Sequence, residues 1–169
     1  MLGIIMAGGR GTRLLPLTEN KPKPLVNILG KPVIDYVKDA LVNANVSEII
    51  VTTGYQGDSL AELVNQWNNN LAIECSVNQE NSPMGTAGSV KLLQSKLTET
   101  FIVASGDAVI SSNLKLLHDA HRNSGAVVTM GLWDVEDPTQ FGIVGLSSEH
   151  NGSLNGQLHE GFVVKFQEK

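Results

Sequence analysis

The sequence contains one cysteine, no long apolar run and no excess of basic residues, and each of these features excludes a class of protein. Cys75 has no second cysteine with which to form an internal disulfide, so the sequence predicts a buried, inert thiol in a reducing compartment. No apolar stretch approaches the roughly 20 residues that a membrane-spanning helix needs. The net charge of −5 argues against a general nucleic-acid binder, because such proteins usually carry a basic face. The composition therefore predicts a cytoplasmic protein with neither a membrane nor a nucleic-acid partner.

The basic residues that the chain does have gather near its N-terminus. Residues 1–31 hold five of the twelve lysines and arginines and only one acid, so this segment carries a charge of +4 and the remainder a charge of −9. The same segment contains the stretch "AGGRGTRL" at residues 7–14, directly after an apolar run. Glycines permit close backbone approach and arginines bind anions, so the segment is a candidate anion site. A solvated basic face is the alternative explanation.

The apolar pattern alternates between strands and helices along the chain. Strands are predicted at residues 3–7, 48–54, 71–77, 101–105, 126–135, 141–147 and 162–167, and helices at 32–44, 58–67, 85–97 and 113–125, with a polar loop at 148–161. This alternation predicts one α/β domain over residues 1–169, with a mostly parallel sheet and helices on both of its faces. Ligands bind beyond the carboxyl ends of such strands. The segments "GGRGTR", "GYQGD", "NQENSPMG" and "SGDA" are therefore expected at one edge of the sheet.

The glycine spacing in "GGRGTR" matches neither the dinucleotide-binding pattern G-x-G-x-x-G nor the P-loop pattern. Both patterns also open a helix at once, whereas Pro16 and the run "NKPKPL" predict that this chain stays extended until the helix at 32–44. An anion bound here would be held by loop amides and side chains. Pro22 and Pro24 flank Lys23 and restrict the backbone on both sides, which fits an ammonium held at a fixed position; a merely rigid surface loop is the alternative.

Five ordered blocks give the chain a resemblance to a known family. The stretch "AGGRGTRLLPLTENKPKPLVNILGKPVIDYV" resembles the N-terminal signature of the sugar-1-phosphate nucleotidyltransferases, and the match continues through "PMGTAG", "SGD", "DPTQFGIV" and "FQEK". The motifs are most similar in style to those of mannose-1-phosphate guanylyltransferases. The resemblance implies a three-layer, Rossmann-like nucleotide-diphospho-sugar transferase fold with a mixed sheet. It also implies transfer of a nucleoside monophosphate from a nucleoside triphosphate to a sugar 1-phosphate, with release of pyrophosphate.

The resemblance assigns roles to individual residues. Arg13 would bind the departing β- and γ-phosphates, Lys23 would lie beside the α-phosphate, and Asp107 would hold Mg2+. A buried structural aspartate in a turn is the alternative for Asp107. Nucleotide binding would fall to Ala7, Gly8, Gly9, Gly11, Thr12, Glu80, Pro83, Gly85 and Thr86. On the acceptor side, Gly142 and Glu168 would contact sugar hydroxyls, and Lys169 would bind the sugar phosphate.

The residue at position 80 indicates which nucleotide base the protein binds. Thymidylyl- and uridylyl-type relatives generally carry glutamine where this chain has Glu80. A carboxylate offers only acceptors and so matches the N1–H and N2–H2 donors of guanine. The sequence therefore favours GTP, with a mannose- or heptose-type 1-phosphate as the acceptor. The adjacent Gln79 keeps a glucose-1-phosphate enzyme specific for UTP or dTTP as an alternative, because a shift of one residue would restore the glutamine pattern.

Other expectations concern the whole protein. A non-catalytic regulatory or structural subunit is a further alternative, against which the presence of Arg13 and Lys23 argues. Members of the family usually run on past "FQEK" into a segment that closes over the sugar and supplies a second metal-binding aspartate. The chain is therefore expected to comprise the nucleotide half and the start of the sugar half, and to bind a nucleotide with poor turnover by itself. A homo-oligomer stays open. His118 and His121 are expected to be structural helix residues rather than metal ligands.

Overall fold

The computed structural model describes residues 1–54, 56–147 and 161–168. The chain divides into two compact units, Met1–Thr129 and Met130–Lys169. The first unit contains a parallel sheet with helices, and the second contains a small antiparallel hairpin. The single domain expected over residues 1–169 stays a prediction. None of the helices in the described ranges is long and apolar enough to cross a membrane.

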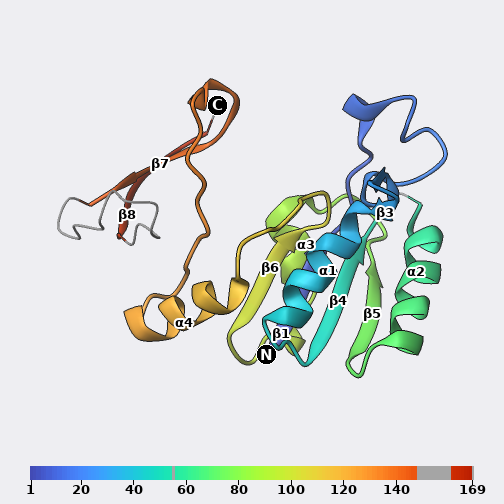
Figure 1. The fold of residues 1–169 in the computed structure, drawn as a ribbon, viewed down its shortest axis with the longest axis horizontal. Helices are drawn as coiled ribbons and strands as arrows, with labels where there is room; N and C mark the ends of the chain where they lie inside the picture. Colours follow the sequence, from blue (N-terminus) through green and yellow to red (C-terminus); the bar gives the residue numbers. More distant parts are fainter. Residues whose placement is uncertain (55, 148–160, 169) are drawn as a thin grey trace. The chain divides into compact units, whose positions relative to one another are not determined.

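The first unit is built on a four-stranded sheet in which every neighbouring pair is parallel (Figure 1). In the order β5-β4-β1-β6, the strands are Glu74–Gln79, Glu48–Thr53, Leu2–Met6 and Phe101–Ser105. Met6 lies opposite both Thr52 and Ser105, and Thr53 lies opposite Gln79. The four strands therefore end level with one another, and the loops that follow them leave from one edge.

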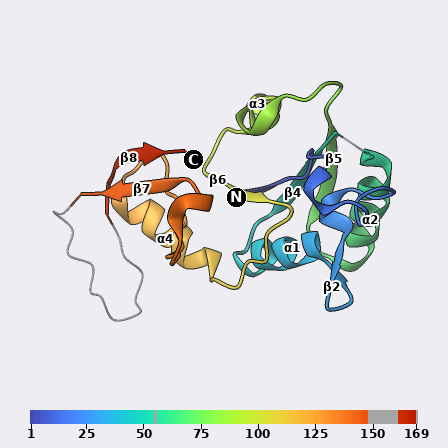
Figure 2. The same ribbon diagram turned by 90° about the horizontal axis from the view of Figure 1, so that it is seen from above.

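Helices cover both faces of this sheet, because successive apolar residues in a strand point to opposite sides. Ile5, Ile49 and Val51 belong to the larger core cluster, which they form with the apolar faces of α1 (Val33–Asn43) and α2 (Gly57–Asn70). Ile4 and Ile50 belong to a second cluster with Leu93, which follows α3 (Gly85–Lys91). Figure 2 shows α1 and α3 on opposite sides of the sheet. The helices on both faces confirm the predicted layers.

The long connection between β1 and α1 is not extended throughout, so that expectation was wrong in part. It contains two short 3-10 turns, η1 (Thr12–Leu14) and η2 (Lys23–Leu25), and a two-residue hairpin of β2 (Asn27–Ile28) and β3 (Lys31–Pro32). Proline is compatible with such turns because its φ is close to the value that a 3-10 turn needs. The prolines around η2 also fit an extended backbone, so the sequence alone does not distinguish the two conformations.

Two further elements differ from the expected ones. The helix predicted at 85–97 ends at Lys91 and gives way to a 3-10 turn, η3 (Gln94–Lys96). The strand predicted at 126–135 does not form, and the side chains of Val127 and Trp133 are 95% and 80% exposed. An apolar segment becomes a strand only where a neighbouring strand pairs with its backbone hydrogen-bonding groups. None of the described strands pairs with this segment.

The remaining helix of the first unit and the elements of the second agree more closely with expectation. Helix α4 (Leu114–Ser124) begins after Asn113, whose side-chain oxygen accepts a hydrogen bond from the backbone N–H of Lys115. In the second unit, η4 (Pro138–Gln140) precedes the antiparallel pair β7 (Ile143–Leu146) and β8 (Val163–Gln167). Most of the polar loop predicted at 148–161 lies outside the described residues.

Candidate active site

Three backbone hydrogen bonds join the carboxyl ends of the four strands one residue beyond the sheet. The backbone N–H of Ala7 donates to the carbonyl of Thr52 at 2.8 Å, and that of Glu80 donates to the carbonyl of Thr53 at 2.7 Å. On the other side of β1, the N–H of Gly106 donates to the carbonyl of Met6 at 2.9 Å. These bonds fix the starting points of the loops, so the glycine loop lies between the loops that carry Glu80 and Asp107.

Gly8 and Glu80 meet at this edge. A Cβ atom added to Gly8 would lie 3.5 Å from Oε1 of Glu80 and 3.7 Å from the backbone nitrogen of Gly54. Glu80 is only 9% exposed. Its Oε2 accepts a hydrogen bond of 3.3 Å from the backbone N–H of Met84, whereas its buried Oε1 has no hydrogen-bond partner among the described residues. A buried acceptor without a partner is costly, so this oxygen is suited to receive a donor from a ligand.

Lys23 and Asp107 form an ion pair, in which the Lys23 ammonium donates to Oδ2 of the carboxylate. The hydroxyl of Ser105 donates to Oδ1 at 2.5 Å. Burial alone would raise the pKa of Asp107, but the hydrogen bonds from Lys23 and Ser105 outweigh it and hold that pKa below its ordinary value. Pro22 and Pro24 are both buried on either side of Lys23. The Lys23 ammonium therefore extends from a backbone segment whose two flanking prolines are buried.

Gly11 connects the glycine loop to Lys23. Its φ of +64° is a conformation that side chains other than glycine rarely adopt. Its carbonyl accepts a hydrogen bond of 2.9 Å from the hydroxyl of Thr18, which is 2% exposed. An added Cβ would lie 2.9 Å from Cβ of Lys23, which is closer than such atoms can approach. At Gly9, by contrast, an added Cβ would meet nothing within 4 Å.

The other predicted nucleotide-binding residues divide by exposure. Thr12 and Arg13 are exposed on η1, and Arg13 forms no ion pair within the described ranges. Exposed positions at the start of α3 include Pro83, Gly85 and Thr86. Ala7 is different, because its side chain is buried in the core and its N–H is bonded within the sheet. Only the carbonyl of Ala7 is left for a ligand.

Comparison with known proteins identifies the family. Residues 2–169 match the model of the nucleotidyl transferase family. The chain belongs to this family. It is 34% identical to the mannose-1-phosphate guanylyltransferase catalytic subunit beta of Xenopus tropicalis, over 99% of this chain and 46% of that protein. It is 33% identical to the mannose-1-phosphate guanyltransferase of Saccharomyces cerevisiae, over 85% of this chain and 41% of that protein. The chain therefore spans less than half the length of these relatives.

Solved structures confirm the fold. HddC from Yersinia pseudotuberculosis, determined in complex with GMP-PN, superimposes with a TM-score of 0.72 at 25% identity, over 99% of this chain and 69% of that one. A Bacillus anthracis protein described as a glucose-1-phosphate thymidylyltransferase, in complex with a sucrose, gives a TM-score of 0.79 at 21% identity, over 99% of this chain and 64% of that one. At that identity the second likeness shows the fold alone. Both support the Rossmann-like α/β architecture of this chain.

The second unit brings together two of the three predicted sugar-side residues. A Cβ atom added to Gly142 would lie 3.3 Å from Oε2 of Glu168 and 3.3 Å from Cζ of Phe166. The pairing of β7 with β8 explains this proximity, because Ile143 lies opposite Gln167. Lys169 lies outside the described residues.

Several residues that support the site were not singled out from the sequence. Ser105 orients Asp107, Thr18 bonds the glycine loop, and the Met84 amide holds Glu80. Gly106 also belongs here, since an added Cβ would lie 3.0 Å from the carbonyl oxygen of Met6. Gly106 and Ser105 stand in the quoted block "SGD", so the signal was present. The contacts of Thr18 and Met84 depend on tertiary structure and leave no pattern in the sequence.

Asp107 is the predicted metal ligand, and its surroundings fit a divalent cation. Mg2+ typically binds one or two carboxylates and completes its shell with substrate phosphates and water. Asp107 is one such carboxylate: its side chain is 33% exposed, and one oxygen already holds a cationic group. The helix histidines make other contacts: His121 lies 2.9 Å from the hydroxyl of Thr129, and His118 lies 3.7 Å from Asp119. No group of three metal-ligating side chains gathers within the described ranges.

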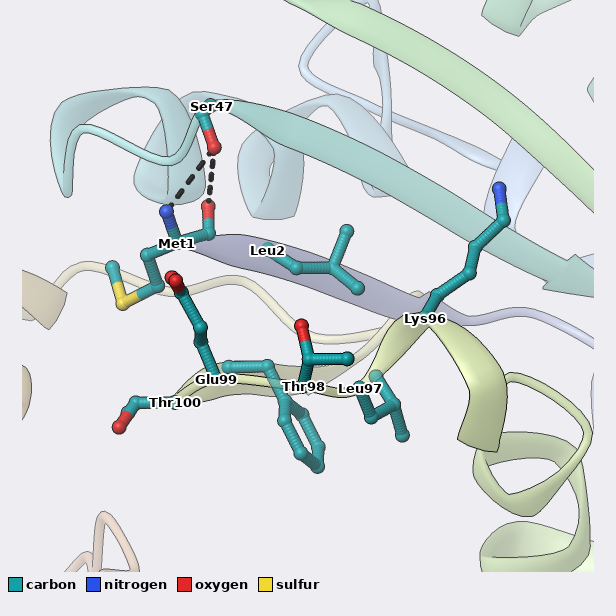
Figure 3. Close-up of a pocket in the computed structure, with 9 residues that line it drawn as sticks. Met1, Leu2, Ser47, Lys96, Leu97, Thr98, Glu99 and Thr100 are labelled. Carbon is teal, nitrogen blue, oxygen red and sulfur yellow. Dashed lines mark hydrogen bonds between the residues drawn. The ribbon is translucent and has the colours of Figure 1, made fainter.

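A cavity and the Cys75 thiol lie away from the predicted site residues. A cavity of about 140 Å3 lies at the opposite, amino edge of the sheet (Figure 3), where the N-terminal amine of Met1 donates to the Ser47 hydroxyl at 3.1 Å. None of the predicted site residues lines it. Cys75 is a free thiol and is buried as predicted, and burial raises its pKa. Tyr55, the neighbour of Gln56 before α2, lies outside the described residues.

Proposed function

We propose that the protein containing this chain transfers a nucleoside monophosphate from a nucleoside triphosphate to a sugar 1-phosphate. GTP is the proposed donor, and a mannose- or heptose-type 1-phosphate is the proposed acceptor. The observation that carries the proposal is the gathering of the Gly8–Glu80 contact and the Lys23–Asp107 ion pair at one edge of a parallel sheet. The relatives named above as mannose-1-phosphate guanylyltransferases support the same reaction.

The chemistry of Glu80 supports guanine as the base. Its Oε2 is already bonded to the Met84 amide, so Oε1 is the oxygen left for a ligand. A carboxylate can only accept hydrogen bonds, and the N1–H and N2–H2 groups of guanine are donors. Gly8 presents no side chain above Oε1, so a planar base would approach that oxygen over the backbone. The likeness to a structure determined with GMP-PN agrees with this base.

The reaction requires charge to be positioned and neutralised. A phosphate oxygen of the sugar 1-phosphate forms a bond to the α-phosphorus, and the bond from that phosphorus to the bridging β-phosphate oxygen breaks, releasing pyrophosphate. In the proposed roles, the backbone of the glycine loop cradles the triphosphate, and Lys23 lies beside the α-phosphate. Arg13 binds the leaving pyrophosphate from its exposed position on η1. Asp107 would hold the proposed Mg2+, which supplies charge neutralisation between phosphate oxygens. In the second unit, Gly142 and Glu168 are proposed to bind sugar hydroxyls, and Lys169 the sugar phosphate.

Pyrophosphate release tests this function. Purified protein is supplied with GTP, UTP, dTTP or ATP and Mg2+, each with mannose 1-phosphate, glucose 1-phosphate or no acceptor. We expect release with GTP and a mannose-type acceptor, and little release without an acceptor. Release with UTP or dTTP and glucose 1-phosphate instead would refute the base assignment. The assay uses the whole protein that contains this chain, because the chain by itself is expected to bind a nucleotide with poor turnover. Nucleotide binding by the whole protein without release from any pair would favour the non-catalytic subunit.

A further inference from the structure

The ion pair between Lys23 and Asp107 joins two groups that the proposed function uses for different partners. There, Lys23 serves a phosphate and Asp107 serves a divalent cation, whereas in this structure each is neutralised by the other. Lys23 cannot pair with Asp107 while Lys23 contacts a phosphate and Asp107 binds a divalent cation. A carboxylate oxygen that binds a divalent cation leaves an ammonium at the same oxygen facing like charge. The inference below rests on the proposed function.

The two oxygens of Asp107 are held differently. Oδ1 accepts the hydrogen bond of 2.5 Å from the Ser105 hydroxyl, and Ser105 itself is fixed at the end of β6, opposite Met6. Oδ2 accepts the Lys23 ammonium, which belongs to the long loop rather than to the sheet. The side chains of Lys23 and Asp107 are 36% and 33% exposed, so a cation from solvent can reach Oδ2.

We propose that Asp107 exchanges one cation for another at Oδ2. Lys23 occupies this oxygen in the unliganded protein and leaves it when a divalent cation binds, so that the Lys23 ammonium becomes available to the α-phosphate. Ser105 is a positioning residue that keeps the carboxylate oriented through its hydrogen bond to Oδ1 in both states. Lys23 therefore lowers the affinity of the unliganded protein for divalent cations. Release of Lys23 is coupled to occupation of the metal site.

Binding of Mn2+ alone, in the absence of nucleotide, tests the competition. Electron paramagnetic resonance of free Mn2+ measures the affinity of wild type, Lys23→Met and Lys21→Met. Lys21 is the matched control, because it lies two residues away in the same loop and forms no ion pair within the described ranges. A partly exposed ion pair of this kind contributes up to about 1 kcal/mol. We therefore expect Lys23→Met to bind Mn2+ roughly threefold to fivefold more tightly than Lys21→Met.

The outcomes separate the exchange from the proposed function. Equal affinities of Lys23→Met and Lys21→Met would overturn the exchange, as would affinities too weak to measure in every variant. Asp107→Asn should abolish Mn2+ binding; retained binding would show that the metal lies elsewhere, which also overturns the exchange. GTP binding is measured in parallel by calorimetry. A protein that binds GTP but shows no difference between the lysine variants would retain the proposed function and lose only this inference.

A spectroscopic measurement on wild type follows the Lys23 ammonium directly and does not compare affinities between variants. The Lys23 ammonium should give a slowly exchanging 15N–1H signal while it is bonded to Asp107, assigned by its absence from Lys23→Met. Titration with diamagnetic Mg2+ should remove this signal as Lys23 enters solvent, and its persistence at saturating Mg2+ would refute the exchange.

Ser105→Ala should weaken Mn2+ binding and Ser105→Thr should restore it. Unchanged affinity in Ser105→Ala would remove the positioning role of Ser105.

Discussion

Replacing Glu80 with glutamine should reverse the preference of the site for guanine. The Met84 N–H requires an acceptor, so the glutamine oxygen takes the position of Oε2 and the NH2 group takes that of Oε1, beside Gly8. A donor then faces the donors of guanine. Hydrogen bonds to charged groups contribute about 1.5 to 3 kcal/mol. GTP should therefore bind roughly 10- to 150-fold more weakly to Glu80→Gln. UTP, which offers an acceptor and a donor, should bind at least as tightly as it does to wild type.

Competition against a fluorescent nucleotide measures all four triphosphates on wild type and Glu80→Gln. Glu74→Gln is the matched control, because it makes the same chemical change at the exposed, opposite end of β5. Urea denaturation of both variants checks that the fold is retained. An equal loss of affinity for GTP and UTP in Glu80→Gln would show that Glu80 supports the loop without reading the base. Unchanged GTP affinity would show that guanine lies elsewhere.

Three further substitutions test the loop and its surroundings. Gly11→Ala should lower the free energy of unfolding by about 1 to 2 kcal/mol because of its positive φ, and should also weaken nucleotide binding, whereas Gly9→Ala should change urea denaturation little. Arg13→Ala should raise the barrier by about 3 to 5 kcal/mol, or roughly 150- to 5,000-fold in pyrophosphate release, with Arg10→Ala as the charge-matched control; equal losses would refute a specific role. Burial opposes ionisation of Asp39, but two lysines outweigh it and hold its pKa below the ordinary value. Asp39→Asn should therefore destabilise the fold by less than about 1 kcal/mol at pH 7, and denaturation at lower pH should show this difference vanish as Asp39 becomes protonated below about pH 4.

The sheet of the first unit was predictable because its strands are bounded by strong local signals. β1, β4 and β6 are short apolar runs, each followed by glycine or polar residues, and the residues between them show helical spacing. The segment at 126–135 is also rich in apolar residues but forms no strand in the structure. Strand formation depends on a partner that lies elsewhere in the sequence. Local periodicity cannot supply that information.

The parts of the candidate site that could be predicted are side chains whose chemistry suggests their role, such as carboxylates that accept hydrogen bonds or bind cations. Glu80 and Asp107 were assigned from motif positions, and the structure brings Glu80 to Gly8 and Asp107 to Lys23. The partners that orient these side chains were missed, since Met84 contributes only a backbone N–H, which any residue except proline would provide. The cytoplasmic location stays a prediction, and the oligomeric state stays open.

The long loop would hold the proposed triphosphate without the start of a helix. In a P-loop, helix geometry fixes the backbone amides around the phosphates. Here the glycine loop is followed by 3-10 turns, so its shape must come from side-chain contacts. The Thr18 hydroxyl bonds Gly11, Gly11 packs on Lys23, and Lys23 pairs with Asp107 at the sheet edge. These contacts form one connected series from the loop to β6. A change at any member should therefore disturb the others, and substitutions at Gly11 and Asp107 should not be additive.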